Sequence, residues 1–276
     1  MLPELLPTAA HPVAPDTFLI PTLAADPSGA GVFSSNSMVI RGTEPVIVDT
    51  GSRLVRESWL STVFSVVEPA DVRWIFVSHD DHDHIGNLDA VLALCPQATL
   101  VGNWAMTARL FGDVELPLER MRWLDQGEAF DAGDRTLHLV RPPLFDSPTT
   151  RGLFDPTTNV LWAVDTFGAM VQGNILEADD ADPDLYAGTF DAMNTWNTPW
   201  LEWVDTARFA AHIDETASLP LNAVASAHGP ILRGVRIAEA FARTAALAAQ
   251  PALPTPGQAM LDQLLSAFDP SVATAV

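Results

Sequence analysis

Residues 78–87 read SHDDHDHIGN, and this stretch carries most of the information about the fold. It follows residues 74–77, WIFV, a short apolar run typical of a strand that is buried on both faces. The six consecutive side chains from His79 to His84 can all bind a metal, and at the end of a buried strand they would be costly to hold together unless a cation neutralised them. The stretch therefore predicts a metal-binding loop; the alternative is a solvated acidic loop.

Segments with strand-like and helix-like patterns alternate on both sides of this loop. Runs rich in β-branched residues at 32–41 and 45–49 predict a hairpin. Further strands are expected at 98–101, 136–141, 160–164 and 223–225, and helices at 54–67, 88–94, 104–111, 186–216 and 234–249. Because strands and helices alternate without a break in composition, we expect one α/β domain over residues 16–250.

Residues 251–276 differ in composition and are expected to form a separate tail. The tail begins rich in Pro and Ala, and apolar residues then recur at helical spacing, namely Met260, Leu261, Leu264, Leu265 and Phe268. This spacing predicts a short amphipathic helix that either docks on the same domain or supplies a contact in a homodimer.

The metal loop resembles that of the metallo-β-lactamase superfamily, which usually reads His-x-His-x-Asp-His followed by x-Gly. Residues 48–51, VDTG, resemble the first turn of that superfamily. At the second ligand position this chain has Asp81 in place of His, which resembles the flavodiiron proteins and related oxygen-binding diiron proteins. The resemblance implies an αβ/βα sandwich, in which two mixed sheets lie face to face, helices flank them, and the metals lie where strand-end loops converge.

Three later segments also resemble the diiron branch, so the resemblance covers about residues 16–235. Residues 141–148, RPPLFDSP, resemble its Pro-x-Leu-His-x-Pro loop, with Asp146 where a His ligand is expected. Residues 161–169, LWAVDTFGA, resemble a Leu-Phe-x-x-Asp-x-Phe-Gly-x segment, which implies that Asp165 bridges two metals. Residues 225–230, ASAHGP, resemble the segment that supplies the last ligand, here His228.

The resemblance implies two metal ions with a shared carboxylate. The first ion is assigned to His79, Asp81, Asp146 and Asp165. The second is assigned to Asp83, Asp165 and His228, and a ligand role for His84 is left open. Two neighbouring residues are expected to act from behind the ligands: Asp49 braces the loop, and His82 points away from the metals or faces a substrate.

The donor set also bears on which metal is bound. Asp81 and Asp146 replace two expected imidazoles, so the first position is rich in carboxylate oxygen, which suits iron or manganese better than zinc. We expect iron, while zinc and a partly filled, degenerate site remain alternatives.

Three functions are compatible with these residues. The first is a non-haem diiron protein that binds or reduces dioxygen, nitric oxide or peroxide with electrons from a separate redox partner. A separate partner is needed because the residues after His228 contain no phosphate loop for FMN, so we expect neither a flavodoxin domain nor FMN on this chain. The second is a dinuclear hydrolase, in which a metal-bridging hydroxide attacks an ester or amide. The third is a non-catalytic protein with a degenerate site.

Composition excludes other classes of function. The 14 basic and 35 acidic residues give a net charge of −21, which disfavours binding to nucleic acid or to anionic membrane surfaces. The single cysteine, Cys95, allows no internal disulfide. No apolar run is long enough to cross a bilayer, and the N-terminal residues do not resemble a signal peptide, so a cytoplasmic location is expected.

Overall fold

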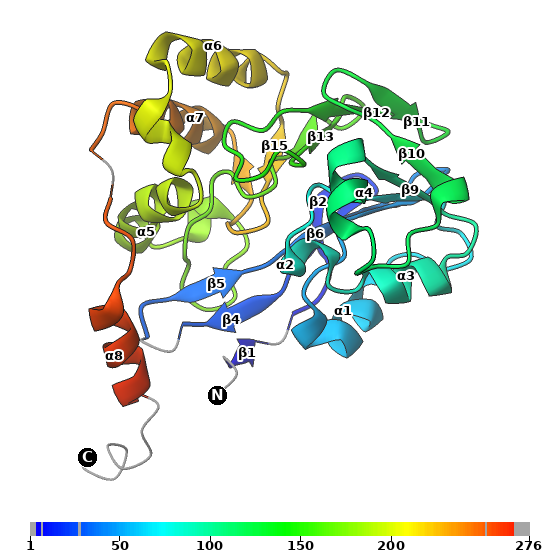
Figure 1. Ribbon diagram of the computed structural model, residues 1–276, viewed down its shortest axis with the longest axis horizontal. Helices are drawn as coiled ribbons and strands as arrows, with labels where there is room; N and C mark the ends of the chain where they lie inside the picture. Colours follow the sequence, from blue (N-terminus) through cyan, green and yellow to red (C-terminus); the bar gives the residue numbers. More distant parts are fainter. Residues whose placement is uncertain (1–3, 7, 27–28, 252, 268–276) are drawn as a thin grey trace.

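Two β-sheets lie face to face in the computed structural model of this chain, and helices cover their outer faces (Figure 1). The structure describes residues 4–6, 8–26, 29–251 and 253–267. Within these residues, no helix is both long and apolar enough to span a membrane.

The first large sheet contains seven strands in the order β10-β9-β8-β7-β6-β3-β2. Its strands are β2 (His11–Ala14), β3 (Thr17–Ile20), β6 (Ser37–Ile40), β7 (Val46–Val48), β8 (Trp74–Phe76), β9 (Thr99–Gly102) and β10 (Met121–Trp123). Strands β7 to β10 are parallel, whereas β2, β3, β6 and β7 form antiparallel pairs, so the sheet is mixed.

The second large sheet contains six strands in the order β11-β12-β13-β14-β15-β16. Its strands are β11 (Ala129–Asp131), β12 (Thr136–Val140), β13 (Gly152–Asp155), β14 (Val160–Trp162), β15 (Ala223–Ala225) and β16 (Leu232–Arg233). Only the β14–β15 pair is parallel, so this sheet is mixed as well. A small third sheet joins β1 (Leu5–Leu6), β4 (Leu23–Ala25) and β5 (Val32–Ser34).

Helices cover the outer face of each large sheet. The first sheet is covered by α1 (Arg56–Val63), α3 (Leu88–Leu94) and α4 (Trp104–Leu110), and the second by α5 (Pro183–Trp196), α6 (Thr206–Ala217) and α7 (Val235–Leu247). Short helical turns are η1 (Arg53–Val55), α2 (His82–Ile85), η2 (Leu118–Arg120), η3 (Ala178–Asp180) and η4 (Pro199–Trp203), and α8 is Gln258–Ala267. The αβ/βα sandwich predicted from the sequence is therefore confirmed.

Alternation along the strands explains how one sheet serves two cores. In β7, Val46 and Val48 pack between the sheets, while Ile47 packs under the helices. All three side chains are fully buried, so the strand is apolar on both faces, as expected for a central parallel strand. Each such side chain contributes about 1.5–3 kcal/mol through burial.

Several elements differ from the sequence prediction. The predicted strand 32–41 is two strands in different sheets, because Asn36 leaves the ladder and its side-chain amide donates to the Ser226 and Gly229 carbonyls. The predicted helix 54–67 is η1 followed by α1, and the predicted helix 186–216 is α5, η4 and α6. Strand β2 precedes residue 16, so the folded domain begins earlier than predicted.

The amphipathic tail helix forms, and three of its described apolar side chains are exposed to solvent. Met260, Leu261 and Leu265 of α8 keep 42%, 48% and 58% of their surface exposed. In Figure 1, α8 extends away from the two sheets. Phe268 and the rest of the predicted tail, 269–276, lie outside the described residues.

Candidate metal centre

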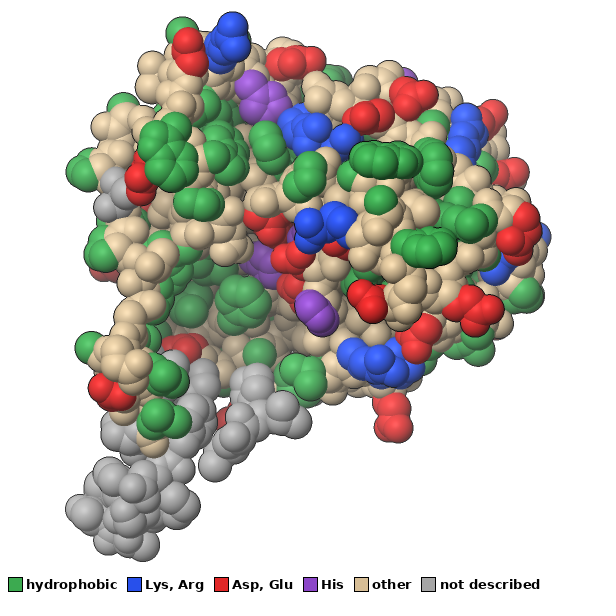
Figure 2. Space-filling model, in the orientation of Figure 1, with side chains coloured by type: hydrophobic (Ala, Val, Ile, Leu, Met, Phe, Trp, Pro, Cys, Tyr) green, Lys and Arg blue, Asp and Glu red, His purple; other side chains and the backbone are tan. Residues whose placement is uncertain are grey.

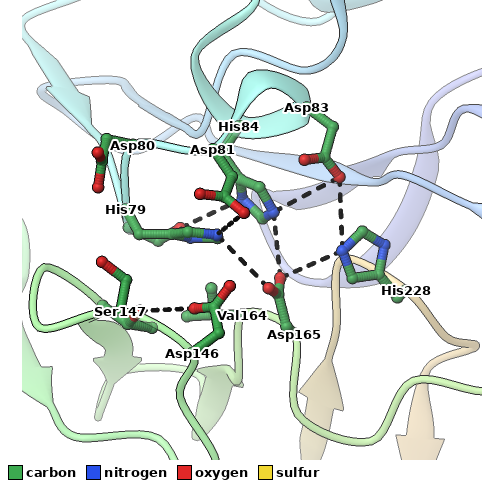
Figure 3. A network of polar contacts seen from close by, with 12 residues as sticks. His79, Asp80, Asp81, Asp83, His84, Asp146, Ser147, Val164, Asp165 and His228 are labelled. Atoms are coloured by element: carbon green, nitrogen blue, oxygen red, sulfur yellow. Dashed lines mark hydrogen bonds and ion pairs between the residues drawn. The ribbon is translucent and has the colours of Figure 1, made fainter. Parts of the chain in front are cut away.

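The strand ends place the predicted ligands at one edge of the sandwich (Figure 3). Strands β7 and β8 are parallel, and the loops after them carry Asp49 and residues 79–84. Strands β14 and β15 are also parallel, and Asp165 and His228 follow them. Because carboxyl ends of parallel strands meet at the same edge of a sheet, residues far apart in the sequence converge here.

Asp49 fixes the start of the metal loop from behind. Its side chain is fully buried, and the backbone N–H of Ser78 donates to Oδ1 at 2.7 Å. The Ser78 hydroxyl and Trp162 Nε1 donate to Oδ2 at 2.8 and 3.0 Å, and His84 Nδ1 lies 2.9 Å from the same oxygen. This network joins both sheets at the first residue of the metal loop.

Hydrogen bonds on the rear nitrogen fix the orientation of two histidine rings. His84 Nδ1 faces Asp49, and His228 Nδ1 lies 2.8 Å from the carbonyl oxygen of Ser34, to which it can donate. Both rings therefore direct Nε2 toward the centre, the arrangement found around metal-binding histidines. Phe33 stacks on the His228 ring with a centroid separation of 5.0 Å, which restricts that ring further.

Asp165 lies between the histidines and faces both sides of the site. Its Oδ2 is 3.4 Å from His79 Nε2, whereas Oδ1 is 3.1 Å from His84 Nε2 and 3.3 Å from His228 Nε2. One carboxylate thus presents a different oxygen to each half of the centre. This is the geometry that a bridging ligand requires.

Backbone strain immediately precedes Asp165. Val164 has φ of 58°, a region that β-branched residues rarely adopt. The Val164 carbonyl oxygen accepts hydrogen bonds from Ala227 N–H at 2.7 Å and from the Ser226 hydroxyl at 3.0 Å. The loop that carries His228 therefore holds the strained turn that aims Asp165 at the site.

Ligand atoms of these residues form overlapping groups in which every atom lies within 4.8 Å of the others. The groups are His79, Asp81 and Asp146; Asp83, His84 and His228; and His79, His84 and Asp165. All seven predicted ligand residues are thus brought together. His82 lies on α2 with an exposed side chain and belongs to none of the three groups.

Three buried atoms at this site lack a hydrogen-bond partner: His79 Nε2, His84 Nε2 and Asp165 Oδ1. A buried polar atom without a partner is costly, and here all three atoms face the space between the ligand groups. Metal ions would satisfy them, since neutral imidazole nitrogen and carboxylate oxygen are their protein ligands. The residues therefore fit a dinuclear centre.

The pKa values of Asp165 and His84 are both shifted by the charges that surround them. Burial opposes ionisation of Asp165, yet His79, His84 and His228 hold its pKa well below the usual range. Burial also opposes protonation of His84, but Asp165 and Asp49 raise its pKa well above the usual value. Asp165 is thus stabilised as an anion by positive charge at its neighbours, and metal ions held there would supply such charge.

Acidic and histidine side chains are visible together at the centre of the face shown in Figure 2, where the region of α2, β5 and β15 lies in Figure 1. The centre is therefore reached from this face. The ligand types differ in exposure: the side chains of Asp81 and Asp83 are 49% and 33% exposed, whereas those of His79 and His84 are 0% and 1% exposed.

Sequence analysis missed the contacts by which neighbouring loops hold the ligands in place. The Asp80 carboxylate accepts a hydrogen bond from Thr149 Oγ1 at 2.7 Å and pairs with Arg109. The Ser34 carbonyl and the Val164 turn were missed as well. A backbone carbonyl has no sequence signal. Asp80 was one of the six potential metal ligands from His79 to His84, but it belongs to none of the three ligand groups and supports the loop through these contacts instead.

Comparison with known proteins identifies the family. A family model described as ODP family beta lactamase matches residues 32–229. A putative diflavin flavoprotein A 1 of Nostoc sp. is 27% identical over 209 residues, which are 75% of this chain and 35% of that protein. The chain therefore spans about a third of the length of that relative.

Solved structures agree on the fold. The flavodiiron protein from Giardia intestinalis superposes with a TM-score of 0.74 at 20% identity, over 89% of this chain and 60% of that one. The rubredoxin oxygen:oxidoreductase from Desulfovibrio gigas gives a TM-score of 0.73 at 17% identity, over 87% of this chain and 62% of that one. Since the family model matches more than half of the sequence, this chain belongs to the ODP family of beta-lactamase-like domains.

Proposed function

We propose that this chain is a non-haem diiron protein that binds or reduces dioxygen or a similar small oxidant. The observation that carries the proposal is Asp165, which presents one oxygen to His79 and the other to His84 and His228. Two iron ions held there would supply redox-active, adjacent binding positions for a diatomic ligand. His79, Asp81, Asp146 and Asp165 would hold one ion, and Asp83, His84, His228 and Asp165 the other.

The donor set supports iron over zinc. Four of the seven candidate ligands are carboxylates, namely Asp81, Asp83, Asp146 and Asp165. Hard oxygen donors suit iron and manganese, whereas zinc in proteins favours nitrogen and sulfur donors. The names of the similar proteins, a flavodiiron protein and a rubredoxin oxygen:oxidoreductase, point in the same direction.

The side chains and backbone around the centre orient the histidine ligands and shield them from water. Asp49 and Ser34 hold the histidine rings so that Nε2 faces the centre. Phe33 covers one side of His228 and limits access of water to that ring. Complete reduction of dioxygen to water consumes more electrons than two ferrous ions release when they are oxidised to the ferric state. A separate electron donor is therefore part of the proposal.

The test is anaerobic loading of the purified chain with Fe²⁺, followed by iron analysis and an absorption spectrum before and after exposure to air. The proposal requires about two irons per chain and a spectrum that changes with oxygen. Dioxygen consumption is then followed with a chemical reductant, and nitric oxide serves as the second candidate oxidant.

A matched pair of variants makes the test specific. Asp165→Asn removes the shared carboxylate and is expected to lower the iron content to one per chain or less. Asp155→Asn changes a carboxylate that is buried even more deeply and pairs with Arg135 away from the centre, and it should keep both irons. Two tightly bound zinc ions, a spectrum insensitive to oxygen and hydrolysis of an ester would instead establish a hydrolase.

A further inference from the structure

The two halves of the centre offer chemically different donors. Position 1 is defined here as His79, Asp81 and Asp146, and position 2 as Asp83, His84 and His228, with Asp165 between them. Position 1 has one imidazole and two carboxylates of its own, whereas position 2 has two imidazoles and one carboxylate. Imidazole favours the later transition metals, and carboxylate favours harder ions such as Mn²⁺.

The carboxylates of position 1 are the more exposed ones. In position 1, the Asp81 side chain is 49% exposed and Asp146 is exposed, whereas the Asp83 side chain of position 2 is 33% exposed. The histidines are buried in both positions, since the side chains of His79, His84 and His228 are 0%, 1% and 10% exposed. Exposed carboxylates stay hydrated and mobile, so a metal must displace water and order them before it binds.

The histidine rings are fixed from behind in both positions. His84 is held at Nδ1 by Asp49 at 2.9 Å and His228 by the Ser34 carbonyl at 2.8 Å, while His79 Nδ1 of position 1 lies 3.1 Å from the Ser78 hydroxyl. The carboxylates are less closely held, since Asp81 Oδ2 lies 3.8 Å from His79 Nε2 and Asp83 Oδ2 lies 3.7 Å from His84 Nε2. Position 2, with two fixed imidazoles and one carboxylate, is therefore arranged for binding more completely than position 1, with one fixed imidazole and two carboxylates.

One buried contact connects the two loops that form position 1. Thr149 is fully buried, and its Oγ1 donates to Asp80 at 2.7 Å. Asp80 precedes Asp81 in the metal loop, and Thr149 follows Asp146 by three residues. This hydrogen bond thus limits how far the two carboxylates of position 1 can move apart.

We propose that the two positions bind with unequal affinity and selectivity. Position 2 fills first and retains its ion, whereas position 1 binds weakly, exchanges its ion and accepts a harder cation. The Asp80–Thr149 hydrogen bond holds position 1 together. The inference rests on the proposed dinuclear centre and adds to it which half is labile and why.

The test is titration of the full chain, freed of metal by a chelator, with Zn²⁺ in competition with a chromophoric chelator. Two steps of one ion each are expected, with dissociation constants about 100-fold apart, because loss of support around a ligand typically costs 10–100-fold in affinity. Chain loaded with one equivalent of Zn²⁺ should then take up one Mn²⁺, seen as loss of the electron paramagnetic resonance signal of free Mn²⁺.

Variants show which of the two positions is responsible for each binding step. Asp146→Ala should remove only the weak step, and Asp146→His should strengthen it. Thr149→Val should weaken the second step about tenfold and leave the first unchanged. Thr17→Val is the matched control, because Thr17 is also fully buried but lies on β3, where it pairs with Ile40 at the end of the sheet away from the centre.

The outcomes separate this inference from the proposed function. Two steps of equal affinity, or loss of the tight step in Asp146→Ala, would overturn the unequal positions and leave the dinuclear centre intact. Failure of the wild-type chain to bind any Zn²⁺ or Fe²⁺ would overturn the proposed function, and the inference with it.

Discussion

Replacing Asp49 with Asn tests whether the contacts behind the ligands govern metal binding. Asp49 is fully buried and is contacted by Ser78, Trp162 and His84. The substitution keeps the size of the side chain and removes its charge. One former acceptor oxygen becomes an NH₂ group, so in either orientation of the amide at least one N–H donor faces another donor.

The magnitude follows from these contacts. A hydrogen bond to a charged group is worth about 1.5–3 kcal/mol, and a buried donor without a partner adds a cost of similar size. Asp49→Asn should therefore lower the free energy of unfolding of the metal-free chain by about 3 kcal/mol. It also removes the group that orients the His84 ring, so the affinity of the tight metal position should fall about 10–100-fold.

Two assays separate the effects. Urea unfolding of the metal-free chain gives the loss of stability, and competition with a chromophoric chelator gives the loss of Zn²⁺ affinity. Asp155→Asn is the matched control, since Asp155 is 2% exposed and accepts from Arg135, Thr157 and Thr158. It should reduce stability and leave Zn²⁺ affinity unchanged. Our reasoning is refuted if Asp49→Asn binds Zn²⁺ as tightly as the wild type.

Two further predictions concern the region around the metal loop and its core. Gly86→Ala would place a Cβ atom 2.3 Å from the Arg53 nitrogen and 2.6 Å from the Gly51 carbonyl oxygen, both of which are backbone atoms. We therefore expect the free energy of unfolding, measured with urea, to fall by about 2–3 kcal/mol. An unchanged unfolding midpoint would contradict this close approach. Burial raises the pKa of the Cys95 thiol to about 11, so iodoacetamide at pH 8 should modify the unfolded chain and spare the native one. Rapid labelling of the native chain would show that the core cluster around Cys95 opens readily.

The sequence predicted the ligands better than it predicted what supports them. Asp81, Asp165 and His228 each occur in a short segment with a recognisable spacing, and such a segment can be read without knowing the fold. The contacts of Ser34 and Thr149 depend on the close approach of loops that are far apart in the sequence. Nothing in the local pattern of either residue indicates such a contact.

Element boundaries failed where tertiary contacts outweigh local pattern. The run at 32–41 has the composition of one strand, yet Asn36 bonds to the loop around His228, and the chain changes sheets there. The tail helix shows the opposite case. Its apolar spacing predicted a helix correctly, but spacing cannot say whether a partner surface exists, and Leu261 and Leu265 remain exposed.

The charge around position 1 bears on the kind of ligand that the centre accepts. Asp81 and Asp146 lie on its open side, and burial together with repulsion from Asp146 and Asp165 raises the pKa of Asp81. Arg109 lies close enough for Asp80, Asp81 and Asp146 to raise its pKa, but its guanidinium is already paired with Asp80. An anionic substrate would approach an excess of negative charge within a chain of net charge −21, whereas neutral dioxygen or nitric oxide would meet no such barrier. The carboxylates that we propose to weaken metal binding at position 1 thus also favour a small uncharged ligand over a phosphodiester or a carboxylate.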